Sequence, residues 1–277
     1  FSQLPGDVRA YLPRWTPCWK PEGYRGFNVN LAGGTLALVL PVPLAFVFFG
    51  RRWWVRVWML VESVALGLLL ALSLSRGAII GVGMAVGVML VARDRWWLLL
   101  FAGLGLVLLL ASIWLGPLET LELLIGQEGS GVVHGLDRRV ELWSRGLYMM
   151  QDFSFTGVGM GLVEMVLPLL YPTFLIPLDA DIEHVHNLYL QFGAETGFPG
   201  LIALLACLFL MLYAGWRAVQ RARGSRWAPL AIGLLGTVVA LMVHGVVDSV
   251  PLAPKVYLIT WTIFGLALAL DVELIQR

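Results

Sequence analysis

The sequence has 277 residues, of which 59% are apolar and only 13% charged, and its mean hydropathy is +0.81. A soluble domain carries about 25% charged residues, so this composition excludes a soluble globular protein and predicts a chain largely dissolved in lipid. The net charge of +1 gives no indication of nucleic-acid binding. Two cysteines, Cys18 in a polar segment and Cys207 in an apolar run, are too few for a disulfide framework.

About seven stretches are apolar enough to cross the ~30 Å hydrocarbon core as helices, which takes about 20 residues each. They are residues 30–50, 53–74, 77–92, 96–115, 198–216, 228–247 and 255–271. The second and third are separated by a few residues only, which predicts a tight turn. The third has small residues four apart, Gly77, Gly81 and Ala85, which let neighbouring helices approach closely. The sequence therefore predicts an all-α, polytopic helical membrane protein.

Arginines orient these spans. They gather in alternate connections, namely Arg51, Arg52, Arg56, Arg93, Arg95, Arg217, Arg221, Arg223 and Arg226. The positive-inside rule places these connections in the cytoplasm, so the other connections face outward. The predicted organisation is an outward-facing segment 1–29, transmembrane helices 1–4 in 30–115, a large outward-facing helical loop 116–197, transmembrane helices 5–7 in 198–271, and a cytoplasmic tail 272–277.

The outward-facing loop carries most of the polar residues. A helix is predicted around Arg138–Gln151, followed by the glycine-rich turn "TGVGMG" and the apolar stretch "LVEMVLPLLYP". In "DIEHVHNLYLQFGAETGFPG", apolar residues recur at helical spacing: Val185, Leu188, Tyr189 and Phe192. Another face of this predicted helix carries three polar residues: Asn187, Gln191 and Glu195. His186 lies at its N-terminal end, and Gly197 and Pro199 predict its stop.

A metal site is one interpretation of the polar residues before this helix: Asp179, Asp181, Glu183, His184 and His186. Zinc proteases place histidines at i and i+4 on one helical face. Here the two histidines are two residues apart, about 200° around a helix, so they share a face only in an extended segment. The alternative, which this spacing favours, is a solvated acidic loop.

His186 has two interpretations. It is an interfacial residue that caps a helix, or it is a general base, because an imidazole exchanges protons near neutral pH. His184 is the neighbouring candidate for the same role, and spacing alone does not separate the two.

Arg76 interrupts the apolar run "LALSLSRGAIIGVG" with no acidic residue nearby. An arginine inside a bilayer costs about 2.5–3.5 kcal/mol even on the insertion scale. Either its side chain extends to the interface, or the guanidinium points into a polar cavity that receives an anion.

Arg138, Arg139 and Arg145 form a second basic cluster, in the outward-facing loop. Local ion pairing with Glu141 is one explanation. The other is a phosphorylated ligand, because guanidinium groups bind phosphate oxygens in a bidentate manner. Two arginine sites and a histidine facing outward indicate chemistry on a lipid-linked phosphate.

Four ordered motifs carry a resemblance to a known family: "GYRGFNVNLAGGTLALVLPVPLA", "LSLSRGAIIG", "RRVELWSRGLYMMQDFSFTGVGMG" and "HVHNLYLQFGAETGFPGLIALL". In this order, over nearly the whole chain, they resemble the O-antigen ligase and Wzy-type polymerase superfamily. Its members have more spans, and this sequence starts at Phe1 without a signal peptide. We therefore expect an N-terminal group of spans to be missing.

The resemblance implies a GT-C-type glycosyltransferase of the bacterial inner (cytoplasmic) membrane whose site faces the periplasm or cell exterior. The implied donor is a glycan on undecaprenyl pyrophosphate, a carrier in the membrane lipid, and no metal or other cofactor is implied. The acceptor would be lipid A core, a growing polysaccharide or a protein. The alternative function is a transporter or flippase of lipid-linked oligosaccharides, which predicts more polar residues within the spans than Glu62 and Arg76. A purely structural membrane subunit leaves the outer arginines unexplained.

The resemblance also assigns residues. The family's serine-arginine-glycine arginine matches Arg76, the arginine four residues before Trp143 matches Arg139, and the loop histidine before Asn187 matches His186. His186 would then activate the acceptor hydroxyl, while Arg76 and Arg139 stabilise the charge that develops on the pyrophosphate. Attack opposite the carrier would invert the anomeric centre. The expected substrate-binding residues are Arg138, Arg145, Asn187, Gln191 and Glu195. "HGVVD", His244–Asp248, also resembles a family segment, of unassigned role.

Overall fold

The computed structural model describes residues 29–94, 96–115, 131–176, 182, 184–250 and 254–275. In this part of the chain every regular element is a helix. The helices are α2 Val29–Val39, α3 Pro41–Phe49, α4 Trp53–Leu72, α5 Arg76–Arg93, α6 Trp96–Leu115, α8 Gly131–Asp152, α9 Val163–Leu170, α10 Leu188–Ala222, α11 Ala228–His244 and α12 Pro254–Glu273. Cys18, Asp179, Asp181, Glu183 and most of the predicted segment 1–29 lie outside the described residues.

The predicted all-α polytopic membrane fold is confirmed. Five of the described helical segments are long and apolar enough to cross a membrane: Asn30–Phe49, Trp53–Leu72, Arg76–Arg93, Leu188–Ala222 and Val256–Glu273. Two shorter apolar helices, Trp96–Val107 and Ala228–His244, occupy the other two predicted spans. Exposed leucines and tryptophans cover α4 and α6, as expected for helices that face lipid.

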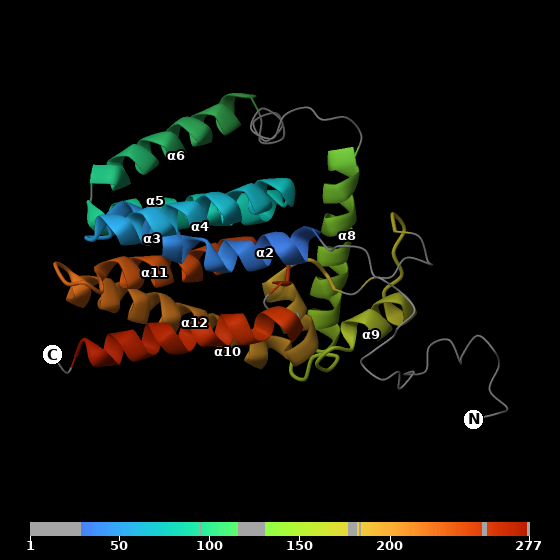
Figure 1. Ribbon diagram of the computed structural model, residues 1–277. Helices are drawn as coiled ribbons and strands as arrows, with labels where there is room; N and C mark the ends of the chain where they lie inside the picture. The colour runs from blue at the N-terminus through green and yellow to red at the C-terminus, as the bar shows by residue number, and fades with distance from the viewer. Residues whose placement is uncertain are drawn as a thin grey trace, which may run out of the picture.

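The spans run side by side, and α8 crosses one end of them (Figure 1). We call this end the α8 end. It contains the α4–α5 turn, the start of α10 and the end of α11. The connections with the predicted cytoplasmic arginines lie at the opposite end, because each span reverses the direction of the one before it.

Helix α11 forms the centre of the bundle and contacts α2, α3, α5, α10 and α12. Small residues permit this packing, as predicted. A Cβ at Gly81 of α5 would lie 2.9 Å from the backbone oxygen of Ala240 in α11, so the two helices approach too closely there for a larger residue. Ala85, one turn further, is fully buried.

The predicted helix around the histidines differs from the observed one at its start, and its predicted stop coincides with a kink. Helix α10 begins only at Leu188, because Asn187 is its N-cap and accepts hydrogen bonds from the backbone N–H groups of Tyr189 and Leu190. The predicted stop falls at a real break, because the backbone is non-helical at Gly197 and α10 consists of two helices joined across a kink there. Gly197 has φ 71°, which kinks the chain before the helix continues to Ala222.

The glycine-rich turn after α8 packs against the residues just before this kink. Backbone N–H groups of Val158 and Gly159 donate to the carbonyls of Ala194 and Glu195, at 2.8 and 3.0 Å. Gly157 has φ +64°, and a Cβ there would lie 2.2 Å from the backbone carbonyl of Glu195. The close packing of the turn "TGVGMG" therefore holds the start of α10 in place after α8.

Candidate functional site

Three segments that are distant in sequence meet at the α8 end: helix α8, the residues just before α10, and the turn after α11. The indole N–H of Trp143 in α8 donates to the backbone oxygen of His186 at 3.1 Å. The amide of Asn187 donates to the carbonyl of Val246 at 2.7 Å. The N–H of Leu188 donates to the carbonyl of Gly245, also at 2.7 Å. These bonds fix the histidine segment between α8 and the end of α11.

The two histidines share one carboxylate. Nε2 of His184 lies 3.2 Å from Oδ1 of Asp248, and Nδ1 of His186 lies 3.6 Å from Oδ2 of the same residue. The centroids of the two imidazole rings are 4.3 Å apart. His186 has φ +52°, a left-handed conformation that non-glycine residues rarely adopt. The helical spacing that argued against a shared face does not apply, because both residues precede the helix.

Asp248 is the functional candidate to which sequence reasoning gave no role. Its side chain is buried, and the N–H of Ser249 donates to Oδ1 at 2.8 Å. Burial alone would raise the pKa of the Asp248 carboxyl, but the interactions with His184 and His186 outweigh it and hold the pKa well below its usual range. Asp248 is therefore a carboxylate at physiological pH. The sequence feature that pointed to Asp248 was the motif "HGVVD". It lies about 60 residues after the histidines, so the sequence alone did not show that Asp248 pairs with them.

The two arginines assigned by resemblance lie on two elements, α5 and α8, that each come near His244. Arg76 is the first residue of α5 and is exposed. A Cβ at the next residue, Gly77, would lie 3.8 Å from Nδ1 of His244. Arg139 of α8 is half-buried and close enough to His244 for their charges to interact. Arg76 thus adjoins a residue that packs against His244, and Arg139 lies within electrostatic range of His244.

The other two arginines of α8 that were predicted to bind substrate, Arg145 and Arg138, have different surroundings from Arg139. The Nε–H of Arg145 donates to the carbonyl of Pro172 at 2.9 Å, and its guanidinium lies over the ring of Phe174. Glu141 accepts the backbone N–H groups of Phe174 and Leu175 at 2.5 and 2.9 Å. Arg145 and Glu141 therefore hold the segment after α9 against α8. Arg138 is exposed on α8.

The polar side chains on one face of the start of α10, Gln191 and Glu195, form hydrogen bonds with other groups of the protein. Oε1 of Gln191 accepts the N–H of Val185 at 2.9 Å, and its amide donates to Oε1 of Glu195 at 2.7 Å. The Glu195 carboxylate also accepts a backbone hydrogen bond from Gly161. Both side chains are buried. With the Asn187 cap, these contacts position the histidine segment, and binding of substrate by Asn187, Gln191 and Glu195 stays a prediction.

A sequence profile of the O-antigen ligase family matches residues 62–205, more than half of the chain. The chain belongs to the O-antigen ligase family. A search of curated proteins found no match. Membership gives the protein a role with lipid-linked glycans and their acceptors in general terms, in agreement with the resemblance seen in the sequence.

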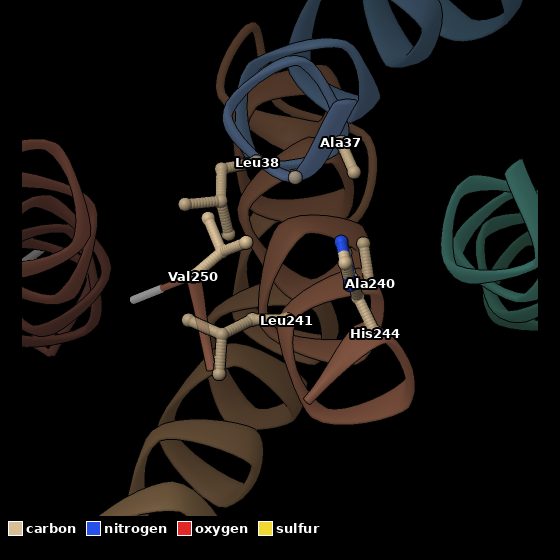
Figure 2. Close-up of a pocket in the computed structure, with 7 residues that line it drawn as sticks. Ala37, Leu38, Ala240, Leu241, His244 and Val250 are labelled. Atoms are coloured by element: carbon tan, nitrogen blue, oxygen red, sulfur yellow. The ribbon is translucent and has the colours of Figure 1, made fainter. Parts of the chain in front are cut away.

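The matched region of this O-antigen ligase family member contains Arg76, Arg139 and His186 but ends before the turn after α11. Two residues beyond the matched region nevertheless contribute to the candidate site: His244, the last residue of α11, and Asp248 in the turn that follows. His244 is buried, and neither ring nitrogen has a hydrogen-bond partner among the described residues. Figure 2 shows its ring pointing toward the helix of Ala37 and Leu38, in a small apolar hollow. The hollow is lined by Gly34, Ala37, Leu38, Ala240, Leu241, His244 and Val250.

Proposed function

We propose that this member of the O-antigen ligase family is an inverting membrane glycosyltransferase that moves a glycan from undecaprenyl pyrophosphate to an acceptor hydroxyl, without a metal or other cofactor. The acceptor is lipid A core, a growing polysaccharide or a protein. The observation that carries the proposal is the convergence of His186, Asp248 and two arginine-bearing elements at one end of a membrane bundle.

His186 is the proposed general base. Its Nδ1 is buried and faces Asp248, whereas its side chain as a whole is 33% exposed. Nε2, the other ring nitrogen, is the atom that we propose faces the acceptor. Nε2 takes the proton of the hydroxyl as its oxygen attacks the anomeric carbon. The bond from that carbon to the pyrophosphate oxygen breaks, and the leaving group takes the electron pair. The Asp248 carboxylate orients the ring and stabilises the imidazolium that forms.

Arg139 and Arg76 act on the leaving group in this proposal. Negative charge grows on the pyrophosphate as the glycosidic bond breaks, and fixed cations stabilise it most where water is partly excluded. Arg139 is half-buried, which suits that role. Arg76 stands at the N-terminus of α5, where the partial positive charge of the helix adds to its own.

Arginine distribution supports a periplasmic site. The arginine-rich connections at the end opposite α8 predict the cytoplasmic side, so the α8 end faces outward. We infer a multi-pass protein of the bacterial inner membrane whose site opens to the periplasm.

Alanine substitution of His186, Arg76 and Arg139, one at a time, tests the mechanism. Transfer from an undecaprenyl pyrophosphate-linked glycan should fall about 100-fold or more in each variant at normal membrane levels. Arg223→Ala, an exposed arginine at the opposite end, is the matched control and should keep its rate. Full transfer by His186→Ala would remove the proposed base.

A further inference from the structure

The cluster of His184, His186 and Asp248 has a geometry that transfer chemistry alone does not require. One donor atom from each residue lies within 4.8 Å of the others. The two described histidine-to-carboxylate separations are 3.2 and 3.6 Å. Two ligands bound to zinc at about 2.0–2.1 Å in a tetrahedral arrangement lie about 3.3–3.4 Å apart. Both histidine-to-carboxylate separations are close to this value, and small side-chain shifts would bring the three donor atoms, which lie within 4.8 Å of one another, around one cation.

Two atoms of this cluster are buried without a hydrogen-bond partner among the described residues. They are Nδ1 of His186 and Oδ2 of Asp248, and they face each other at 3.6 Å, too far for a good hydrogen bond. The Asp248 side chain is only 3% exposed. Buried polar atoms left unpaired are costly, and a cation between these two would satisfy both.

We propose that His184, His186 and Asp248 bind one divalent transition-metal cation of the zinc class, and that the bound cation reversibly blocks glycan transfer. Two imidazoles and one carboxylate suit zinc rather than calcium or magnesium, which prefer oxygen ligands. The histidine side chains are 22% and 33% exposed, so a cation reaches the cluster from outside the protein.

The blocking effect rests on the proposed function, whereas the binding site does not. A cation on Nδ1 of His186 separates the ring from Asp248. A neutral imidazole that binds the cation through Nδ1 carries its hydrogen on Nε2, so Nε2 has no free lone pair for the proton of the acceptor. Zinc therefore acts as an inhibitor here and has no part in the transfer step.

Binding is measured first, by calorimetric titration of zinc chloride into purified, chelator-treated protein without substrate. The wild-type protein should bind one equivalent. His184→Ala, His186→Ala and the nearly isosteric Asp248→Asn should each weaken binding by at least about tenfold. His134→Ala, which removes a histidine that the proposal does not use, is the matched control and should bind as the wild type does. Thermal unfolding of each variant checks that it is folded. No binding, or equal binding by the three cluster variants, would overturn the site.

Transfer is then measured on the same wild-type preparations with and without zinc. The rate should fall in step with occupancy and recover when EDTA is added. Binding at the cluster with unchanged transfer would overturn the block, and with it His186 as base. A dependence of transfer on His186 without zinc binding would overturn the metal site and leave the proposed function standing. Loss of transfer on chelation, restored by zinc, would overturn the inhibitory role.

Discussion

The two ends of the bundle both carry charged residues, but they use them differently. At the end opposite α8, Asp271 of α12 pairs with Arg221 and with Arg217 of α10, the latter at 3.3 Å. Arg51 donates to the carbonyl of Gly224 at 2.5 Å. At the α8 end, one buried carboxylate serves two histidines, and facing polar atoms of Asp248 and His186 are unpaired.

The contrast indicates that charges at the opposite end hold helices together, whereas those at the α8 end are arranged for something that binds there. Groups that pair with each other have little capacity left for a ligand. Buried atoms without a partner among the residues that the structure describes also occur at the opposite end, at Nε of Arg217 and Nε1 of Trp227, but at the α8 end two of them, Nδ1 of His186 and Oδ2 of Asp248, face each other.

The substitution with the largest expected effect tests the contrast between the two ends through the rate of glycan transfer. Asp248→Asn should lower the turnover number about 100- to 1,000-fold, because the amide neither stabilises the imidazolium nor holds the ring of His186 in the required tautomer. The Michaelis constant for the donor should change little. Asp271→Asn, the same change at the opposite end, should lower thermal stability and keep the rate. Equal rates for the two variants would contradict the division of roles between the ends.

The second effect is on stability, at two glycines with positive φ. Gly157→Ala should lower the free energy of unfolding by about 2–3 kcal/mol, because strain adds to a clash 2.2 Å from the Glu195 carbonyl. Gly224→Ala, at φ +73° with nothing within 4 Å, should cost only about 1 kcal/mol. Denaturant unfolding of both variants in the same detergent measures the difference. If Gly224→Ala lowered the free energy of unfolding more than Gly157→Ala does, the turn that contains Gly157 would be shown to tolerate a side chain.

Trp143→Phe should have a smaller effect on activity. It removes the hydrogen bond from the indole to the backbone of His186 and keeps an aromatic ring. We expect transfer to fall about tenfold, which corresponds to the loss of a hydrogen bond of about 1.4 kcal/mol. Trp227→Phe, at the opposite end, is the matched control, because its Nε1 has no partner to lose among the described residues. Transfer should be compared at equal protein levels, and equal rates for the two variants would contradict a positioning role for Trp143.

Sequence reasoning could predict the spans and their turns, because an apolar run of about 20 residues has few other uses. It could also name Arg76, Arg139 and His186, through the resemblance. It could not predict that the histidines pair with Asp248. That contact depends on the left-handed backbone at His186 and on the turn after α11, and neither follows from residue spacing. The polar row on α10 shows the converse limit. Helical spacing put Gln191 and Glu195 on one face, but only the packing of the glycine-rich turn shows that this face is buried.

The smallest effect concerns Tyr171, which lies near α8 but pairs in the way that residues at the opposite end do. Its hydroxyl donates to Oδ2 of Asp152 at 2.6 Å. Burial, with help from that hydrogen bond and the Asp152 charge, raises the pKa of Tyr171 from 10.0 to about 12. Because the folded state holds the phenol proton more tightly, this pair stabilises the fold fully below pH 10, and the contribution is lost as the pH rises toward 12.

Tyr171→Phe should therefore lower the thermal unfolding midpoint slightly at pH 8, by an amount that corresponds to about 1 kcal/mol or less. The gap between wild type and variant should narrow as the pH rises above 10, since the wild-type pair ionises while phenylalanine does not. Unfolding scans of both proteins from pH 8 to pH 11 measure it. Glycan transfer at neutral pH should be unchanged, because Tyr171 satisfies its hydrogen bond with Asp152 and has no role in the site. A variant that lost transfer but not stability would place Tyr171 with the histidines rather than with the paired charges.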